Sequence, residues 1–232
     1  LMNLAIHSIE ADLGPFNADT FHNDLHPQLK ADFIMANPPF NLSDWNDGSL
    51  NDDPRWKYGL PPSGNANFAW MQHMIHHLSP VGKIGLVLAN GSLSSQSGGE
   101  GEIRRKIIED DLIEGIIAMP TQLFYTTQIP VSLWFLNRNK KQKGKTVFVD
   151  ARNMGQLVTR RLRELNYEND DGSAGDIKKI AQVFEDFEGG TLEDVKGFCA
   201  SVSTAEIAKQ DYILTPGRYV GVEEQEDDGE PF

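Results

Sequence analysis

Short apolar runs that alternate with helical patterns are the feature that most constrains the fold of this chain. Residues 31–36, 83–89 and 112–119 are predicted to form strands. The second is almost continuously apolar, as in strands that are buried on both faces of a parallel sheet. Helical patterns at 66–78 and 102–109 lie between these strands. Alternation at these lengths favours right-handed crossover connections, so the sequence predicts an α/β fold with a parallel sheet.

Further patterns extend this arrangement on both sides. Residues 131–136 and 146–150 predict two strands joined by a basic loop, which would give the parallel sheet an antiparallel edge hairpin. Residues 1–13 have apolar side chains at helical spacing, and Gly14-Pro15 ends the pattern. This helix has no visible start and the chain lacks an initiator Met. We therefore expect a fragment of a longer polypeptide, truncated on the N-terminal side of its sheet.

Composition places the chain among ordinary globular proteins. Its 232 residues include 39% apolar side chains, which is enough for one main domain with a sizeable core. No run approaches roughly 18 apolar residues, so neither membrane insertion nor secretion is indicated. Cys199 is the single cysteine, so no internal disulfide is possible, and a reducing cytoplasm is the natural setting.

The charge of the chain is unusual for a protein that grips nucleic acid. Its formal net charge is −13, whereas a protein that binds phosphate usually carries a basic face. Basic clusters occur at 104–106 and 138–145. A solvated helix turn and a polar loop are favoured for them over contact with phosphate. Contacts to phosphate are therefore expected to come largely from another protein.

The tetrapeptide Asn37-Pro38-Pro39-Phe40 stops the first predicted strand and carries the most specific chemistry. Prolines cannot donate to a strand ladder, so the strand must end at Asn37, and a residue before proline is held in extended geometry. Two acceptors, Asn37 Oδ1 and the Pro38 carbonyl oxygen, can then converge. Phe40 offers a face for a planar ring, a contact worth roughly 1–3 kcal/mol for a nucleobase.

Such a corner suits an exocyclic amine on an aromatic ring. Two acceptors that hold both N–H bonds of the amine would favour a pyramidal nitrogen, which can attack an electrophilic methyl group. Residues 90–92 and 120–122 end other predicted strands and should face the same crevice, since ligands of open α/β sheets bind outside the carboxyl ends of strands. The alternative is a Pro-Pro turn that closes a strand in front of a core phenylalanine.

Motifs in a consistent order extend well beyond the tetrapeptide and cover most of the chain. With them, the chain resembles the modification subunits of type I restriction-modification systems, the HsdM-like N6-adenine DNA methyltransferases. The resemblance implies a Rossmann-like methyltransferase sheet that is mostly parallel. The motifs are Met2-Asn3-Leu4-Ala5-Ile6, Asn37-Pro38-Pro39-Phe40-Asn41, Gly85-Leu86-Val87-Leu88-Ala89-Asn90-Gly91, Leu133-Trp134-Phe135-Leu136-Asn137 and Pro216-Gly217-Arg218-Tyr219-Val220.

The resemblance also implies a substrate, a methyl donor and site residues. S-adenosylmethionine would supply the methyl group, and the target adenine would be flipped out of the DNA duplex. By position, Asn37 and Pro38 would hold the adenine N6 amine, with Pro39 stiffening the corner and Phe40 stacked on the ring. Asp24 and Asn37 would contact the cofactor, Asp24 at its adenine. An ordinary turn explains Asp24 equally well.

Two parts of the family's cofactor pocket are missing from this sequence. The glycine-rich loop Asp-Pro-x-x-Gly-Ser-Gly and the acidic residue that holds the ribose should both precede Leu1. We therefore expect this polypeptide alone to bind S-adenosylmethionine weakly or not at all, and to be inactive alone. Residues 1–150 are predicted to form a partial methyltransferase domain, 151–222 its C-terminal extension and 223–232 an acidic flexible tail.

Membership in a type I system implies partners. A specificity subunit would read the DNA sequence and a restriction subunit would join the same cytoplasmic complex, so an acidic catalytic subunit could reach DNA through the complex. No membrane partner is expected. Two other functions stay open. One is N-methyl transfer to a protein glutamine or an RNA base, which uses the same Asn-Pro-Pro-aromatic chemistry, and the other is a non-catalytic role as a subunit-docking module.

Histidines and tryptophans near the motif have simpler explanations than ligand binding. His73 and His77 are four residues apart on the second predicted helix, but no further ligand completes a zinc pattern, so surface histidines are favoured and no metal is expected. Trp45 and Trp56 lie in a long polar loop, 41–65, where they could stack on DNA or pin the loop. Pinning is favoured.

Overall fold

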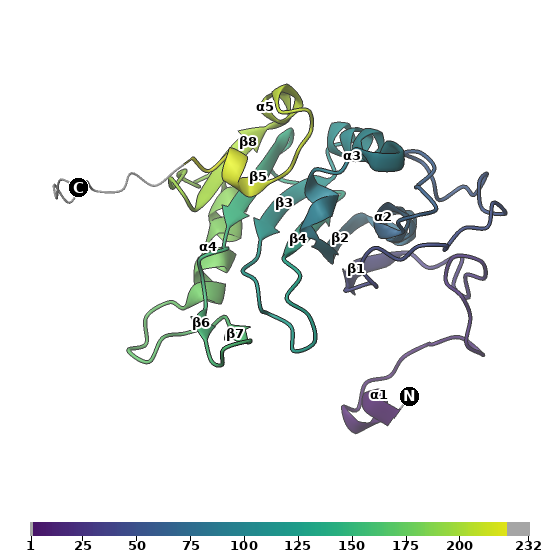
Figure 1. The fold of residues 1–232 in the computed structure, drawn as a ribbon, viewed down its shortest axis with the longest axis horizontal. Helices are drawn as coiled ribbons and strands as arrows, with labels where there is room; N and C mark the ends of the chain where they lie inside the picture. The colour runs from purple at the N-terminus through teal and green to yellow at the C-terminus, as the bar shows by residue number, and fades with distance from the viewer. Residues whose placement is uncertain (1, 222–232) are drawn as a thin grey trace.

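A six-stranded sheet organises the computed structural model, which describes residues 2–221 (Figure 1). The strands are β1 (Ala31–Ala36), β2 (Leu78–Ala89), β3 (Ile113–Ala118), β4 (Val131–Asn137), β5 (Lys145–Asp150), β6 (Gln156–Leu157), β7 (Arg163–Glu164) and β8 (Cys199–Ser203). The strand order of the large sheet is β1-β2-β4-β3-β5-β8. A separate two-stranded sheet pairs β6 with β7.

Four strands of the large sheet in residues 2–221 run in one direction, and two run against them. β1 pairs in parallel with β2, and β3 pairs in parallel with β5. β4 is antiparallel to both of its neighbours, β2 and β3, and β8 is antiparallel to β5. The predicted α/β fold, with a mostly parallel sheet and an antiparallel part, is confirmed. The predicted hairpin is wrong, because residues 131–136 and 146–150 do not pair with each other.

The side chains of β4 explain why it lies inside the sheet rather than at an edge. Trp134 is fully buried and Leu136 is nearly so, while Val131 and Ser132 are buried as well. A strand that is buried on both faces is better placed between two neighbours, where both backbone edges are hydrogen-bonded. A hairpin at the edge would have left one side of this apolar strand without a partner.

Helices cover both faces of the sheet. α2 (Asn67–His77), α3 (Glu100–Glu109) and α5 (Thr204–Lys209) join one hydrophobic cluster, and α4 (Asp176–Gly189) joins a second. Neighbouring residues of β3 divide between them, since Ile116 belongs to the first cluster and Ile117 to the second. None of the helices in residues 2–221 is long and apolar enough to cross a membrane. Short 3-10 helices are η1 (Asn90–Leu93), η2 (Ser97–Gly99) and η3 (Pro216–Arg218).

Most of the helix predicted for residues 1–13 is not formed. α1 covers only Met2–Ile6 and buries none of its residues. Ile9 and Leu13, two of the apolar residues in that pattern, lie outside the helix and are 55% and 50% exposed. A short helix without a buried face is marginal in water because nucleation is costly. Apolar spacing alone therefore overestimated the length of this helix.

The polar loop 41–65 contains no helix or strand, and its tryptophans are buried. Trp45 and Trp56 pack edge to face, with ring centroids 5.4 Å apart, and Phe21 packs on Trp45 at 4.9 Å. Both indole N–H groups donate to carbonyl oxygens of the same loop, at 2.9 and 2.7 Å. The prediction that these tryptophans pin the loop is confirmed.

The first and last strands of the large sheet are β1 and β8. Among the described residues β1 is an edge strand whose partner is β2, and its Phe33 and Met35 are 79% and 91% exposed. The opposite edge is β8, so the region after residue 150 joins the same sheet. The domain boundary predicted there stays a prediction. The predicted acidic tail, 223–232, lies outside the described residues.

Candidate active site

The carboxyl ends of β1, β2, β3 and β5 meet at one edge of the sheet, because these strands share a direction. The long connection between β3 and β4 hangs from this edge in Figure 1. Segments 37–40, 90–92 and 120–122 directly follow β1, β2 and β3. All three therefore lie at the edge where ligands of open α/β sheets bind.

The Asn37 motif presents its amide to solvent. Asn37 and Pro39 are exposed, Pro38 is buried and Phe40 is half-buried. Within residues 2–221 the Asn37 carboxamide has no hydrogen-bond partner, so both lone pairs of Oδ1 are available to a ligand. The corner combines a free acceptor, a packed proline and an aromatic ring.

Asn41 and Asn67 fix the chain directly after Phe40, and the sequence-based prediction did not single out Asn67. Asn67, at the start of α2 and 1% exposed, accepts the backbone N–H of Asn41 at 3.2 Å and donates Nδ2 to Asn41 Oδ1 at 3.1 Å. Asn41 has a left-handed backbone, with φ 52°, which asparagine tolerates better than most residues. This reciprocal pair sets the direction in which the chain leaves Phe40.

A second aromatic ring lies beside Phe40. Phe124, in the connection between β3 and β4, makes an edge-on contact with Phe40, with ring centroids 6.1 Å apart and planes at 67°. Both rings pack against the hydrophobic cluster that contains Met119 and Val131. An edge-on neighbour orients the Phe40 ring without covering both of its faces. The only sequence signal for Phe124 was its place soon after the strand-ending Pro120.

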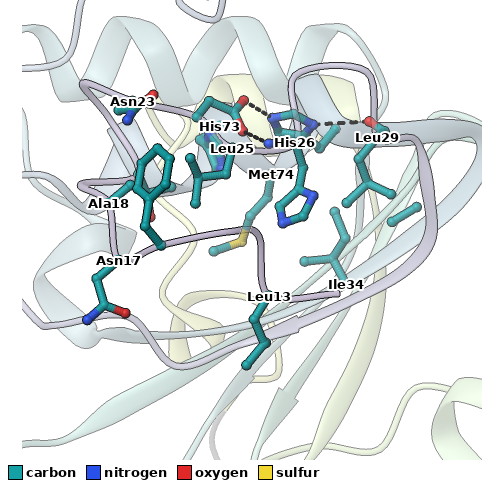
Figure 2. Close-up of a pocket in the computed structure, with 15 residues that line it drawn as sticks. Leu13, Asn17, Ala18, Asn23, Leu25, His26, Leu29, Ile34, His73 and Met74 are labelled. Atoms are coloured by element: carbon teal, nitrogen blue, oxygen red, sulfur yellow. Dashed lines mark hydrogen bonds and ion pairs between the residues drawn. The ribbon is translucent and has the colours of Figure 1, made fainter. Parts of the chain in front are cut away.

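Asp24 lies in the wall of a cavity of about 450 Å³, shown in Figure 2. The walls come from the segment before β1, from β1 itself and from α2. Leu25, Ile34 and Met74 supply apolar side chains, and Asn23 and His26 are among the polar ones (Figure 2). The size falls within the usual range of small-molecule sites, roughly 300–1,000 Å³.

Hydrogen bonds hold the Asp24 carboxylate on two sides. Its Oδ1 accepts the backbone N–H of His26 at 2.9 Å, and its Oδ2 lies 2.7 Å from Nε2 of His77 (Figure 2). His77 Nδ1 lies 3.0 Å from the Leu29 carbonyl oxygen, so each ring nitrogen of His77 faces an oxygen atom of the segment before β1. Burial alone raises the pKa of Asp24, but the hydrogen bonds from His26 and His77 lower it below its usual value.

The prediction of surface histidines on α2 is wrong for this pair. His77 is 5% exposed, and the His73 ring packs on it with centroids 4.6 Å apart. The His77 ring bonds to Leu29 and Asp24 of the segment before β1, and the His73 ring is half-buried. Burial, with the nearby charges of His77 and Arg55, lowers the pKa of His73 to about 4. His73 is therefore a neutral ring at physiological pH.

Ligand atoms of Asp24, His73 and His77 lie within 4.8 Å of one another, which raises the question of a metal. Arg55 Nη1 donates to His73 Nδ1 at 3.1 Å, and both nitrogens of His77 are already hydrogen-bonded. A guanidinium cation this close opposes the binding of a metal cation. We assign the cluster as a hydrogen-bonded network that ties α2 to the segment before β1.

The predicted basic clusters are largely used inside the fold. Arg104 is fully buried and donates to the carbonyl oxygens of Tyr212 and Ser95 at 2.8 and 2.7 Å. Lys140 is 3% exposed and pairs with Asp111 at 2.5 Å. The prediction of solvated side chains is wrong for these two residues, because each is buried and bonds to another segment of the chain. Neither is available to a phosphate group.

The profile of the N-6 DNA Methylase family matches residues 1–228. The chain belongs to this family. The methylase subunit of the type I restriction enzyme HindI from Haemophilus influenzae is 55% identical over 232 residues, which are 100% of this chain and 51% of that relative. The MjaIX methylase subunit from Methanocaldococcus jannaschii is 45% identical over 242 residues, covering 100% of this chain and 41% of that relative. The chain spans about half the length of these curated relatives.

Solved structures of the family have the same fold. The methyltransferase subunit of a type I restriction-modification system from Streptococcus thermophilus superimposes with a TM-score of 0.79 at 27% identity, over 95% of this chain and 45% of that chain. The M protein of the type I restriction enzyme EcoKI gives a TM-score of 0.66 at 20% identity, over 92% of this chain and 50% of that chain. The expected Rossmann-like methyltransferase sheet is thereby confirmed.

Proposed function

We propose that this chain supplies the base-binding site of an adenine-specific DNA methyltransferase, which methylates the N6 amine of a flipped-out adenine. The observation that carries the proposal is the exposed, unpartnered carboxamide of Asn37 beside Pro38 and the half-buried Phe40 ring. These groups lie at the carboxyl edge of the sheet, where this fold places ligands. Membership in the N-6 DNA Methylase family supports the class of reaction.

Each residue of the motif has a physical role in the proposed reaction. Asn37 Oδ1 and the Pro38 carbonyl oxygen accept the two N–H bonds of the adenine amine, and Phe40 stacks on the base. Pro39 keeps the corner stiff. These acceptors localise the nitrogen lone pair toward the methyl group. The nitrogen forms a bond to the methyl carbon as the C–S bond of the donor breaks, and the methylated amine loses one proton to solvent.

The Asp24 cavity fits the adenine end of S-adenosylmethionine, which supplies the electrophilic methyl group when it is bound. The Asp24 carboxylate can accept a hydrogen bond from an amino group, while Leu25, Ile34 and Met74 can cover a flat ring. Asp24 and Asn37 are the donor contacts we propose. We expect the isolated chain to bind the donor weakly or not at all. A calorimetric titration of the isolated chain that shows micromolar affinity would contradict this expectation.

We also propose that the intact protein acts in the cytoplasm within a complex that contains a specificity subunit and a restriction subunit. The two relatives named above are methylase subunits of type I restriction enzymes. A chain with a net charge of −13 gains from a partner that supplies contacts to phosphate. DNA is therefore reached mainly through the complex.

Substitution of Asn37 by alanine in the intact protein tests the proposal. We expect Asn37→Ala to lower DNA methylation by at least about 100-fold, as loss of one preorganised polar contact does in other enzymes, without loss of subunit association. Sequencing of cellular DNA for N6-methyladenine and copurification of the subunits measure the two effects. Asn139→Ala is the matched control, because Asn139 is exposed and follows β4 at the opposite edge of the sheet.

Two results would favour the other functions, which are subunit docking and methyl transfer to a protein glutamine or an RNA base. Unchanged DNA methylation in Asn37→Ala would contradict the catalytic role and leave the docking role. Methyl transfer by the wild-type protein to a glutamine side chain or an RNA base, with none to DNA, would change the substrate class and keep the chemistry of the corner.

A further inference from the structure

The β6–β7 hairpin follows β5, so it lies at the same edge of the sheet as the Asn37 motif (Figure 1). The hairpin is tied to the β3–β4 connection at Gln122. The Gln122 carbonyl oxygen accepts the backbone N–H of Arg163 at 2.8 Å, and Gln122 Nε2 donates to the carbonyl oxygen of Arg160 at 3.1 Å. These long-range bonds hold the hairpin in place beside that connection.

The tip of the hairpin carries two adjacent arginines, Arg160 and Arg161, and both are exposed. The loop is closed by Thr159, whose Oγ1 accepts the backbone N–H groups of Arg161 at 3.2 Å and Leu162 at 3.0 Å. Leu162 is buried and anchors the tip to the rest of the protein. The turn is therefore ordered by its own hydrogen bonds, while its two guanidinium groups remain in solvent.

These arginines differ from most basic residues of the chain because neither has an ion pair or side-chain hydrogen bond within residues 2–221. Glu164 is close in sequence, yet it pairs with neither of them. Many of the other basic side chains form ion pairs with carboxylates, as in the pairs Arg55–Asp53, Lys57–Asp110, Lys83–Glu188, Arg105–Glu109, Lys140–Asp111, Arg152–Asp150 and Lys178–Glu168. In a chain this acidic, two adjacent free cations are a local exception.

The hairpin lies close to the proposed base site through a short path of contacts. Gln122, which bonds to the hairpin, is two residues from Phe124, and two residues span at most about 7 Å. Phe124 contacts Phe40, the ring on which the flipped adenine would stack. Tyr125, the next residue of the same connection, is 89% exposed. The tip is thus within reach of nucleotides that flank a base held at Phe40.

We propose that Arg160 and Arg161 bind phosphate groups of the DNA strand beside the extruded adenine. The proposal rests on the DNA methyltransferase function proposed above. Arginine suits this task because its planar guanidinium can bind a phosphate through two parallel N–H bonds. A flipped nucleotide has lost its stacking and pairing, so contacts to the neighbouring backbone help to offset that cost.

The position of the hairpin distinguishes it from the other exposed basic residues near the strands. Lys143 and Lys145 are exposed too, but Lys145 begins β5, so these lysines lie at the opposite edge of the sheet. A strand of this length separates the two edges by roughly 20 Å. The acidic surface around Glu164, Asp170 and Asp171 repels phosphate, which leaves the arginine tip as the part of the hairpin suited to DNA.

The salt dependence of DNA binding tests this inference. Arg160→Ala and Arg161→Ala are combined in the intact protein with its partner subunits, and affinity for DNA is measured across a range of salt concentrations. The magnitude of the slope of log K against log salt should fall by about 1–2, because each lost phosphate contact removes roughly 0.9. Arg160→Lys with Arg161→Lys should keep most of the slope, since the charge is retained.

Lys143→Ala with Lys145→Ala is the matched control, because it removes the same charge from the opposite edge. Its slope should stay close to that of the wild-type protein. An unchanged slope in the double arginine variant, or an equal change in both double variants, would overturn the inference. If the wild-type complex methylates no adenine in DNA, the proposed function fails. The two failures can be told apart, because methylation is measured by turnover and the salt slopes are measured by binding alone.

Discussion

The base corner and the Asp24 cavity are built in different ways. Asn37 and its neighbours are positioned by their own backbone, because a strand end and two prolines leave the chain few conformations, and the Asn37 side chain has no partner within residues 2–221. Asp24 is positioned by other parts of the chain, above all by His77, which is 53 residues away in sequence. The first site is fixed locally, and the second depends on long-range hydrogen bonds.

The difference predicts which changes affect function and which affect folding. Removing the Asn37 side chain breaks no hydrogen bond within residues 2–221, so its effect should be confined to catalysis. Changes around Asp24 should alter the stability of the fold and the shape of the cavity together, because the same bonds serve both. Three further experiments test this contrast.

The largest expected effect is on stability against pH, through His73. The unfolded ring has its usual pKa of 6.5, whereas burial lowers the folded value to about 4. Between these values the unfolded state binds more protons, so stability is lost as pH falls from 6.5 toward 4, by up to about 3 kcal/mol. Urea unfolding of the intact protein at several pH values measures this loss.

His73→Gln should flatten that pH profile, and His7→Gln, at an exposed site near α1, should leave it unchanged. An identical pH profile for His73→Gln and the wild-type protein would mean that the network around Asp24 does not depend on the neutral ring.

His77→Ala should have the next largest effect, because it removes the ring whose two nitrogens contact the Asp24 carboxylate and the Leu29 carbonyl oxygen. We expect a loss of about 1–3 kcal/mol in the free energy of unfolding, together with weaker binding of S-adenosylmethionine by the intact protein. Denaturant unfolding and calorimetry provide the measurements. His76→Ala is the matched control on the same helix, since His76 is more exposed and lies outside the Asp24 bonds. Equal stability of the two variants would remove the contrast between the sites.

The smallest expected effect comes from Phe124, whose ring orients Phe40. An aromatic pair of this kind contributes about 0.5–1.5 kcal/mol, so Phe124→Ala should lower the rate of methylation by about two- to tenfold. Phe124→Tyr keeps the ring and should restore most of the rate. If Phe124→Ala methylates DNA as fast as the wild-type protein, Phe40 is held by its own backbone alone. That result would sharpen the contrast between the locally fixed Asn37 corner and the Asp24 cavity.

The sequence was sufficient for features that depend on neighbouring residues. The apolar run of β2, the stop at Pro38 and the helical stripe of α2 each follow from local patterns, and they gave the α/β class and the position of the base corner. The corner's role in catalysis remains a prediction. Local patterns could also place Asp24 before β1, but they could not show what holds its side chain.

The predictions that were wrong or missing for β4, His77 and Phe124 have one cause in common. Each of these features depends on contact between residues that are distant in the sequence. The interior position of β4 depends on pairing with β2 and β3, and the burial of His77 depends on the segment that carries Asp24 and Leu29. Phe124 meets Phe40 only after the β3–β4 connection is folded. The prediction for α1 failed for the opposite reason, since no contact within residues 2–221 buries any residue of this helix. Sequence patterns that span a few residues do not indicate such long-range contacts.

The exposed side of β1 has a practical consequence for work with this stretch of chain in isolation. Within residues 2–221, the backbone N–H and C=O groups on the side of β1 away from β2 pair with no other strand. Phe33 and Met35 of the same strand are largely exposed. Such a border is a template on which a second polypeptide can add a strand, so purified samples should form oligomers through it. Assays on the isolated stretch will then report a mixture of assemblies, unless a covering segment or a charged substitution at Met35 blocks the addition.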